Sequence, residues 1–506
     1  MFVRRKKNSS GSFSIQIIQK VGRINKVVKS FGSSFDAVEL DILERQAQLE
    51  IERIQGQTYL FSNDRDSSLK SILSNVGNNQ IELVGPDNIL GRVYESMGYH
   101  KIGGDDLFRD LVMSRLVYPG SKLKTVDYLS RFKNKEVSVY SIYRYMDKIH
   151  KEFKEDIEKI TFKHFEKILG GHIGIVFYDM TTLFFEAPDE DDLRKIGYSK
   201  DGKHQHPQIK LGLLVGSEGY PLGYDIFEGS TYEGYTLIPV LENIQKKFSI
   251  GKPIVIADAG LLSGANIKAL IGHGYKFVLG GKIRNESKEI KDAIQELEIT
   301  EDNPGEVKKD GYRLVVSFSD KRLKKDAHNR KKGLEKLEKK VKNGKIDKSS
   351  INNRGYNKYL KLESEIKVAI DYSKYQLDAR WDGLKGYLTN TDMKAREVID
   401  AYGNLWQIEK AFRISKTDIR IRPIYHRIPE RIQTHICICF VSYAVFKEME
   451  RLLKKRKVSF SANRAIELTK NMYQIRVFLP DSKTYTTVPL KPTQEQQELI
   501  SAIMKT

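Results

Sequence analysis

The chain has 506 residues, of which 40% are hydrophobic and 30% are charged. Its 86 Lys and Arg residues outnumber 66 Asp and Glu residues, so the formal net charge is +20 at pH 7. A chain of this length is too long to fold around a single hydrophobic core, so we expect three or four folding units. The positive balance argues against a cationic partner and favours a polyanion, nucleic acid first, although a generally basic protein without such a partner has the same composition.

Cysteine occurs only at Cys437 and Cys439, inside the apolar segment HICICFVSYAVF. Two cysteines this close give no disulfide framework, and nothing near them completes a four-ligand metal site. Lys447 and Glu448 close the segment before it reaches the roughly 20 apolar residues of a membrane span. We therefore expect a buried core helix, no membrane partner and a reducing cytoplasm.

The sequence pattern of the first third of the chain predicts a small β element followed by helices. Residues 12–31 alternate apolar and polar side chains around the turn-forming VGR, which predicts a hairpin, and a helix is expected from Phe35 toward Gln57. From Asp87 to Leu169 the pattern is helical, with short polar or Gly-containing breaks. Short basic helices of this kind often contact the DNA backbone.

A β-rich run follows. The order is strand, hairpin, helix, strand, helix and strand, which predicts a mixed α/β layer of the ribonuclease H type. The segments, in chain order, are GIVFYDMT, QIKLGLLVG, YPLGYDIFEG, helix 236–247, PIVIAD, helix 265–273 and YKFVLGG.

Between Lys282 and about Tyr387 the alternation stops and a strongly charged stretch appears, which predicts an insertion. Its segment 321–348 is either a solvated helix or a set of phosphate contacts. One helix over 394–416 then resumes the core, and a helix over 431–454 packs against it.

Two carboxylates come where short apolar strands are expected to end, Asp179 after IVFY and Asp258 after PIVIA. Each has an ordinary alternative role, because an Asp at such a position caps the turn that leaves the strand. Together with a third carboxylate they predict metal-assisted phosphoryl transfer, in which carboxylates hold two metal ions roughly 4 Å apart.

The third carboxylate is Glu409, in the stretch AYGNLWQIEKAFRISK. As one continuous helix, this stretch places Tyr402, Glu409, Arg413 and Lys416 on a single face, at spacings of seven, four and three. The neighbouring face is apolar. The pattern predicts a helix that packs into a core and presents a carboxylate, a hydroxyl and two cations to a groove.

These motifs resemble the DDE transposases of bacterial insertion sequences, in the cut-and-paste group whose third acid lies in a Tyr-x2-Arg-x3-Glu-x6-Lys signature. Here the signature reads Tyr402, Leu405, Glu409 and Lys416. Leu405 departs from it, since Leu cannot contact phosphate, and Arg413 projects from the same expected face. The resemblance covers roughly residues 85–450 and includes RLVYPGSKLKTVDYL and GYSKDGKHQHPQIKLGLLV.

The resemblance implies a ribonuclease-H-like catalytic core with a β-rich insertion, after a mainly helical N-terminal region. It implies catalysis by Asp179, Asp258 and Glu409 holding two Mg2+ ions, with Mn2+ able to replace them. Tyr402, Arg413 and Lys416 would bind phosphates, although Arg413 could instead only pair with Glu409. Double-stranded DNA, both transposon ends and target, is the implied partner, with a homodimer in the synaptic complex at the bacterial nucleoid.

The corresponding division of the chain has six parts. They are 1–80, a hairpin and helix expected to bind DNA ends; 81–170, a helical DNA-binding region; 171–284, the first part of the catalytic core; 285–387, a basic insertion; 388–455, the second part of the core; and 456–506, a tail with a role in dimerisation.

Trp381, in ARWDGLKGY, has two interpretations: it stacks on an unpaired base near the cleavage site, or it is a buried aromatic at the end of the insertion. Two alternatives to a transposase are also open. One is a DNA nuclease of the same fold that lacks strand transfer, and the other is a DNA-binding repressor with an inactive core.

Overall fold

The computed structural model describes residues 1–55, 73, 76–198, 202–203, 205–260, 263–343, 345–352, 354–363, 368–479 and 482–504. The chain forms two compact units. We call Lys154–Ala444 the sheet unit, and Met1–Phe153 together with Val445–Thr506 the terminal unit.

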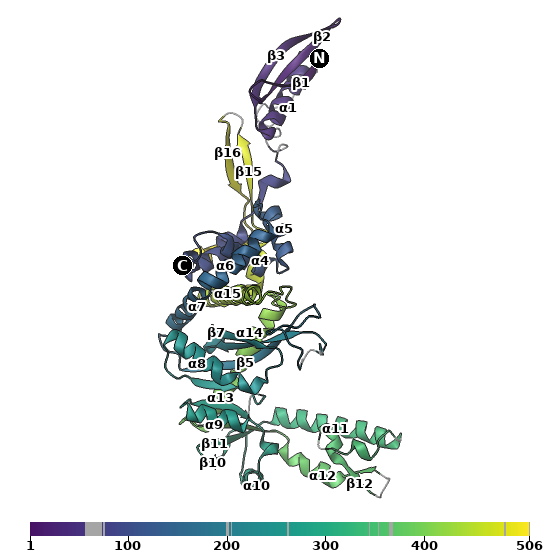
Figure 1. Cartoon of the computed structure of the whole chain (residues 1–506), viewed down its shortest axis with the longest axis vertical. Helices are drawn as coiled ribbons and strands as arrows, with labels where there is room; N and C mark the ends of the chain where they lie inside the picture. Colours follow the sequence, from purple (N-terminus) through teal and green to yellow (C-terminus); the bar gives the residue numbers. More distant parts are fainter. Residues whose placement is uncertain are drawn as a thin grey trace. The chain divides into compact units, whose positions relative to one another are not determined.

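A mixed eight-stranded sheet organises the sheet unit (Figure 1), in the order β10-β11-β14-β9-β8-β5-β6-β7. Strand β8 pairs in parallel with β5 and β9, and the other neighbours are antiparallel. The predicted mixed α/β architecture is confirmed. The strands are β5 (Ile175–Phe184), β6 (Gln208–Val215), β7 (Pro221–Glu228), β8 (Ile254–Ala257), β9 (Phe277–Gly281), β10 (Gly305–Lys309), β11 (Tyr312–Phe318) and β14 (Leu384–Thr389).

Helices cover both faces of this sheet, which is why β6 is buried along its whole length. On one face the Tyr178 hydroxyl of β5 donates a hydrogen bond to Thr236, 2.9 Å away at the start of α8. Successive strand residues point to opposite faces, so Asp179 lies on the other face, against which α14 packs. The helices are α7 (Lys154–Ile168), α8 (Leu237–Phe248), α9 (Gly264–Gly272), α10 (Lys288–Glu296), α13 (Ala395–Gly403), α14 (Trp406–Thr417) and α15 (Pro429–Lys455), which continues into the terminal unit.

The β-rich insertion expected at 285–387 takes a different form. Its strands β10, β11 and β14 belong to the main sheet, and only the chain between Phe318 and Leu384 leaves it. That lobe is dominated by a helix, because its Lys-, Glu- and Leu-rich sequence consists of good helix formers. Figure 1 shows its elements side by side: α11 (Asp320–Lys342), β12 (Leu360–Leu362), β13 (Val368–Ile370) and α12 (Tyr372–Leu377). Leu337, Tyr359, Leu360, Val368 and Ile370 form its own small core.

The prediction of one helix over 394–416 is wrong. Helix α13 ends at Gly403 and α14 begins at Trp406. At the break, the N–H groups of Asn404 and Leu405 donate to carbonyls three residues back, and the Asn404 side chain donates to the Asp400 carbonyl at 3.1 Å. Gly and Asn are poor interior helix residues, and the Asn side chain competes for backbone partners. Tyr402 therefore lies on a different helix from Glu409.

The terminal unit contains the expected hairpin and helix near the N-terminus, with an additional strand. Ile15 and Ile17 of β2 pack on Leu40, Ala47 and Ile51 of α1. The tail after residue 456, whose secondary structure the sequence left undetermined, forms two helices and a hairpin that pairs with β4. The elements are β1 (Phe2–Lys7), β2 (Phe13–Val21), β3 (Ile24–Ser34), α1 (Ala37–Ile54), β4 (Ile81–Leu83), α3 (Arg92–Ser96), α4 (Leu107–Val117), α5 (Lys122–Lys133), α6 (Val139–Lys148), α16 (Ala462–Thr469), β15 (Tyr473–Leu479), β16 (Thr484–Pro489) and α17 (Gln494–Met504).

Among the described residues, no helix is both long enough and apolar enough to cross a membrane.

Candidate active site

Asp179 and Asp258 are neighbours on adjacent parallel strands. The last paired residues of β5 and β8 are Tyr178 and Ala257; Asp179 is the next residue within β5, and Asp258 is the first residue after β8. The two aspartates therefore lie side by side on the face opposite Tyr178. Strand β5 continues to Phe184, so Asp179 does not end its strand as expected; only its parallel pairing with β8 ends there.

Both carboxylates also contact backbone. Asp179 Oδ1 accepts a hydrogen bond from the Met180 N–H at 2.7 Å, and Asp258 Oδ1 accepts one from the Gly260 N–H at 2.6 Å. The second bond is the turn-forming contact that the sequence left open for Asp258. It fixes the path of the chain as it leaves β8.

The Tyr402 hydroxyl is close enough to the three predicted carboxylates to be affected by their charges. Burial raises the pKa of Tyr402, and the charges of Asp258, Glu409 and Asp179 raise it further, as does the nearby Tyr387. The Tyr402 ring packs edge-on against Tyr387, with 5.1 Å between centroids. Acids from β5, from the end of β8 and from α14 thus all lie close enough to influence the charge state of one hydroxyl.

Gly280 of β9 has no side chain, and the Tyr402 hydroxyl occupies the space that a side chain would need. A Cβ atom at position 280 would lie 2.6 Å from Tyr402 Oη and 3.0 Å from the Ala259 nitrogen. No side chain larger than hydrogen fits there without moving Tyr402. The glycine therefore sets how closely α13 approaches the strand ends.

On α14, Glu409 and Arg413 are exposed and Lys416 is half-buried. Their spacing of four and three residues keeps them on one face. Within the described ranges Arg413 makes no ion pair, so the alternative that it only pairs with Glu409 does not occur here. Leu405, at the break, is only 7% exposed, so its side chain does not face solvent.

Lys385 of β14 lies beside Tyr402 and was not among the residues predicted from the sequence. Its Nζ lies 4.4 Å from the Tyr402 ring centroid and 5.3 Å from that of Tyr387. Burial lowers the pKa of Lys385, and the Arg322 charge lowers it further, whereas the Glu409 charge acts in the opposite direction. The available signal was a single cation within the strand LKGYLT, which otherwise carries no charge.

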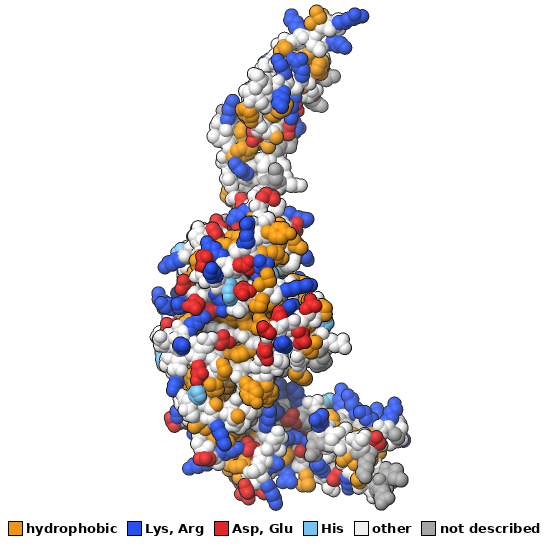
Figure 2. Space-filling model, in the orientation of Figure 1, with side chains coloured by type: hydrophobic (Ala, Val, Ile, Leu, Met, Phe, Trp, Pro, Cys, Tyr) orange, Lys and Arg blue, Asp and Glu red, His pale blue; other side chains and the backbone are white. Residues whose placement is uncertain are grey.

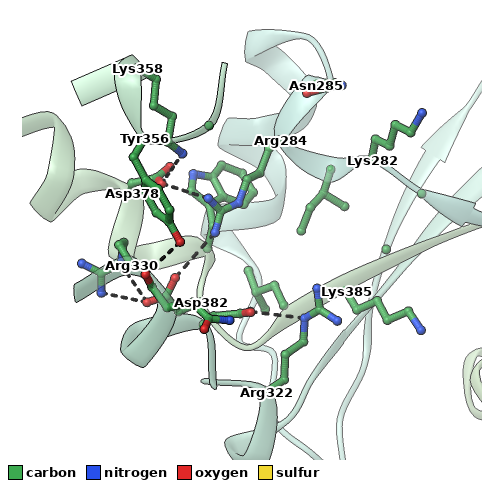
Figure 3. Close-up of a pocket in the computed structure, with 18 of the residues that line it drawn as sticks. Lys282, Arg284, Asn285, Arg322, Arg330, Tyr356, Lys358, Asp378, Asp382 and Lys385 are labelled. Carbon is green, nitrogen blue, oxygen red and sulfur yellow. Dashed lines mark hydrogen bonds and ion pairs between the residues drawn. The ribbon is translucent and has the colours of Figure 1, made fainter. Parts of the chain in front are cut away.

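A cavity of about 650 Å³ lies between the main sheet and the lobe, and Lys385 is part of its lining. Figure 3 shows Arg284, Arg330 and Lys358 directed toward Asp378 and Asp382. Arg330 holds Asp382 with two hydrogen bonds of 2.8 and 3.0 Å, and Arg284 bonds Asp378 at 2.9 Å. These ion pairs tie the lobe to the strand ends. The remaining cations of the wall are Lys282, Arg322 and Lys385.

Trp381 also lines this cavity and is half-buried, so it is neither a fully buried core residue nor a free surface aromatic. It ends the short helical turn Asp378–Trp381 that precedes β14. Its predicted role in stacking on a base stays a prediction.

The donor set is chemically suited to Mg2+, because three carboxylates provide the hard oxygen ligands that this ion prefers. Among the described residues, however, no three or more His, Cys, Asp or Glu side chains converge closely enough to hold a metal ion as they stand. Asp179 and Asp258 are turned toward backbone amides instead. The carboxylates that could bind a metal ion are therefore present, but they are not close enough together to bind one in this conformation.

Comparison with known proteins provides a family assignment. Among solved structures, a piggyBac transposase synaptic complex with hairpin DNA aligns over 76% of each chain, at 11% identity and a TM-score of 0.38. A Mos1 transposase paired-end complex with the left transposon end aligns over 34% of this chain and 57% of that one, at 16% identity and a TM-score of 0.16. A search of curated proteins found no match. The family model described as the transposase DDE domain matches residues 172–445, which is more than half of the chain. The chain therefore belongs to the transposase DDE domain family.

Proposed function

We propose that this protein is the cut-and-paste transposase of a bacterial insertion sequence, with Asp179, Asp258 and Glu409 as its catalytic carboxylates. The proposal is supported by the neighbouring positions of Asp179 and Asp258 at β5 and β8, with the charges of both and of Glu409 acting on Tyr402. Water would first nick the DNA at each end of the element. The freed 3′-hydroxyl would then attack a second phosphodiester.

The core of the proposal is a ribonuclease-H-like fold. It is supported by the strand order β7-β6-β5-β8-β9, in which β6 and β7 extend β5 as an antiparallel hairpin and β8 and β9 run parallel to β5. Strand order runs outward from β5 in one direction to β6 and β7, and in the other direction to β8 and β9. Two of the proposed acids lie at the neighbouring strands β5 and β8, where the direction changes, and the third lies on α14. Such a switch point is a favoured position for a site in an α/β sheet.

The three carboxylates would hold two divalent cations, Mg2+ or Mn2+. Bound there, the ions would activate the attacking oxygen and stabilise the leaving one. Asp179 and Asp258 would exchange their backbone contacts for this role, and Glu409 is already exposed.

The protein's own side chains would position the DNA backbone. Arg413 and Lys416 present cations on the same helix face as Glu409, and Tyr402 offers a hydroxyl that its raised pKa keeps protonated. Lys385 adds a cation 4.4 Å from the centroid of the Tyr402 ring. Trp381 would stack on an unpaired base at the cavity wall.

For the whole chain, we propose that 1–80 binds DNA ends, 81–170 contacts DNA, 285–387 contributes cations, and 456–506 takes part in dimerisation. The core would comprise 171–284 and 388–455. The protein would act as a homodimer on both element ends at the bacterial nucleoid.

The test is a labelled duplex that carries the terminal inverted repeat flanking the gene, incubated with the full chain, Mg2+ and a supercoiled target plasmid. A transposase yields nicked ends and then joined products. Nicked ends that never join would favour the nuclease alternative, and binding without cleavage in Mg2+ or Mn2+ would favour the repressor.

A further inference from the structure

Charge is segregated within the N-terminal module, β1 to α1. Residues 1–35 contain eight Lys and Arg residues and no Asp or Glu. The acidic residues of the module are Asp36, Glu39, Asp41, Glu44, Glu50 and Glu52, all on α1 or at its N-cap. The sheet is therefore cationic and the helix that packs on it is acidic.

Two of the eight cations form ion pairs inside the module, and a third, Arg4, donates a hydrogen bond to the Gln16 side chain at 2.8 Å. Arg5 contacts Asp41 and Glu44 of α1, at 2.9 and 2.7 Å, and Lys29 contacts Glu50 at 2.7 Å. Within the part of the chain that the structure describes, five others make no ion pair: Lys6, Lys7, Lys20, Arg23 and Lys26. Three of these five lie in the outer half of the hairpin, residues 19–30.

The outer hairpin is exposed along its whole length. Every residue from Gln19 to Ser30 is exposed, including Ile24 at 73% and Val21 at 56%. The strands pair out to Val21 and Ile24, and Gly22 closes the turn with a φ of +61°. Figure 2 shows blue Lys and Arg side chains gathered at this tip.

Shape, charge and side-chain chemistry point to one occupant. A two-stranded β ribbon fits the major groove of double-stranded DNA, Arg and Asn are side chains that pair with base edges, and Lys suits phosphates. Exposed apolar side chains at a protein tip fit the thymine methyl groups of that groove. An acidic protein surface would explain the cations but not the amide and apolar side chains at the tip.

We propose that the outer hairpin enters the major groove at the ends of the element and reads sequence there. Arg23 and Asn25 contact base edges, and Lys20 and Lys26 contact the flanking phosphates. This inference deepens the proposed function and rests on it. It places recognition of the terminal repeat on the sheet rather than on the helices of 81–170.

The test compares variants of the full chain on a terminal-repeat duplex and on a scrambled duplex of equal composition. Arg23→Ala with Asn25→Ala should lower the preference for the terminal repeat by about tenfold or more and leave affinity for the scrambled duplex nearly unchanged. Lys20→Ala with Lys26→Ala should weaken binding to both duplexes and reduce the salt slope by about two. Arg53→Ala removes an exposed cation from α1 and is the matched control, expected to bind like the wild type.

Methylation interference at guanine N7 gives a second measurement, because it maps the major-groove contacts of the wild-type protein and of Arg23→Ala. Interference within the terminal repeat that is lost in Arg23→Ala supports the proposal. Full preference in the Arg23 and Asn25 double variant, or no interference by the wild type at any guanine of the repeat, overturns it. If the wild type neither prefers nor cleaves the terminal duplex, the proposed function itself fails.

Discussion

Tyr402 presents a neutral hydroxyl to a site that already holds three acids. Its pKa is raised by burial and by those acids, so at neutral pH it donates a hydrogen bond and adds no negative charge. A hydroxyl in this state can contact a phosphate oxygen, whereas a phenolate would repel it. The position of the ring depends on Gly280 below it and on Lys385 beside it.

Gly280→Ala should displace Tyr402, because the new Cβ would lie 2.6 Å from its hydroxyl oxygen. We expect cleavage to fall by at least about tenfold and stability to fall by about 1–3 kcal/mol, the usual cost of overpacking. Gly272→Ala is the control, since a Cβ there meets nothing within 4 Å. Cleavage rates and melting curves measure both effects, and wild-type cleavage in Gly280→Ala would show that the place of Tyr402 does not matter.

Lys385→Ala should slow cleavage by roughly tenfold or more, the usual effect of losing a charged hydrogen bond to phosphate. Lys385→Arg keeps the cation and should recover much of the rate. The matched comparison is Lys276→Ala, which removes an exposed cation that contacts the Asn390 carbonyl at the far end of the sheet. If Lys385 only packs on Tyr402, the two Lys385 variants will differ in melting temperature but not in the rate constant at saturating DNA.

Among the secondary-structure elements, the sequence predicted those that hydrophobic periodicity and local composition determine. The strands and helices from β5 to β9 were identified because apolar runs alternate with turn residues. The break between α13 and α14 was missed, since the helical spacing of Tyr402 and Glu409 continues across Gly403 and Asn404. The sheet places both residues at one site in spite of the break, through tertiary packing that local spacing does not reveal.

Strand pairing between distant segments was likewise beyond local patterns. Strands β10, β11 and β14 lie within the region expected to be an insertion, yet they extend the main sheet. Their pairing depends on contacts between residues far apart in sequence, such as β9 with β14. Lys385 became recognisable as a site residue only through that pairing, which places it beside Tyr402.

The helix α15 should keep its cysteines unreactive. Both thiols are buried, and burial together with the Glu158 charge raises the pKa of Cys437 to about 12. We expect no labelling of the native protein by a thiol reagent at pH 8, and reaction of both cysteines on unfolding. Rapid labelling without denaturant would contradict the buried position of this helix.

The same shift has a defined sign for stability. Well below pH 9 the thiol of Cys437 is protonated in both folded and unfolded chains, so it does not change the pH dependence of the free energy of unfolding. As the pH rises from about 9 toward 12, only the unfolded chain ionises, and this thiol then lowers stability. In denaturant titrations across that range, the free energy of unfolding should fall more steeply with pH for the wild type than for Cys437→Ala.

At the scale of the whole molecule, the net charge of +20 predicts binding governed by counterion release. If the protein contacts about six to ten phosphates, its affinity for an end-containing duplex should fall by roughly 10³-fold or more between about 50 and 200 mM salt. The logarithm of affinity should fall linearly with the logarithm of salt concentration. A flat dependence would remove nucleic acid as the partner.

We expect Asp179, Asp258 and Glu409 to act together in cleavage and not in DNA binding. The direct measurement is single-turnover nicking of the terminal duplex by Asp179→Asn, Asp258→Asn and Glu409→Gln, with binding measured on the same duplex in Mg2+. Asp392→Asn, which removes a 99% exposed carboxylate, is the control. We expect each of the three variants to bind like the wild type and to nick at least about 10³-fold more slowly, while Asp392→Asn nicks normally. Nicking at the wild-type rate by any one of the three variants would contradict the joint catalytic role of these carboxylates.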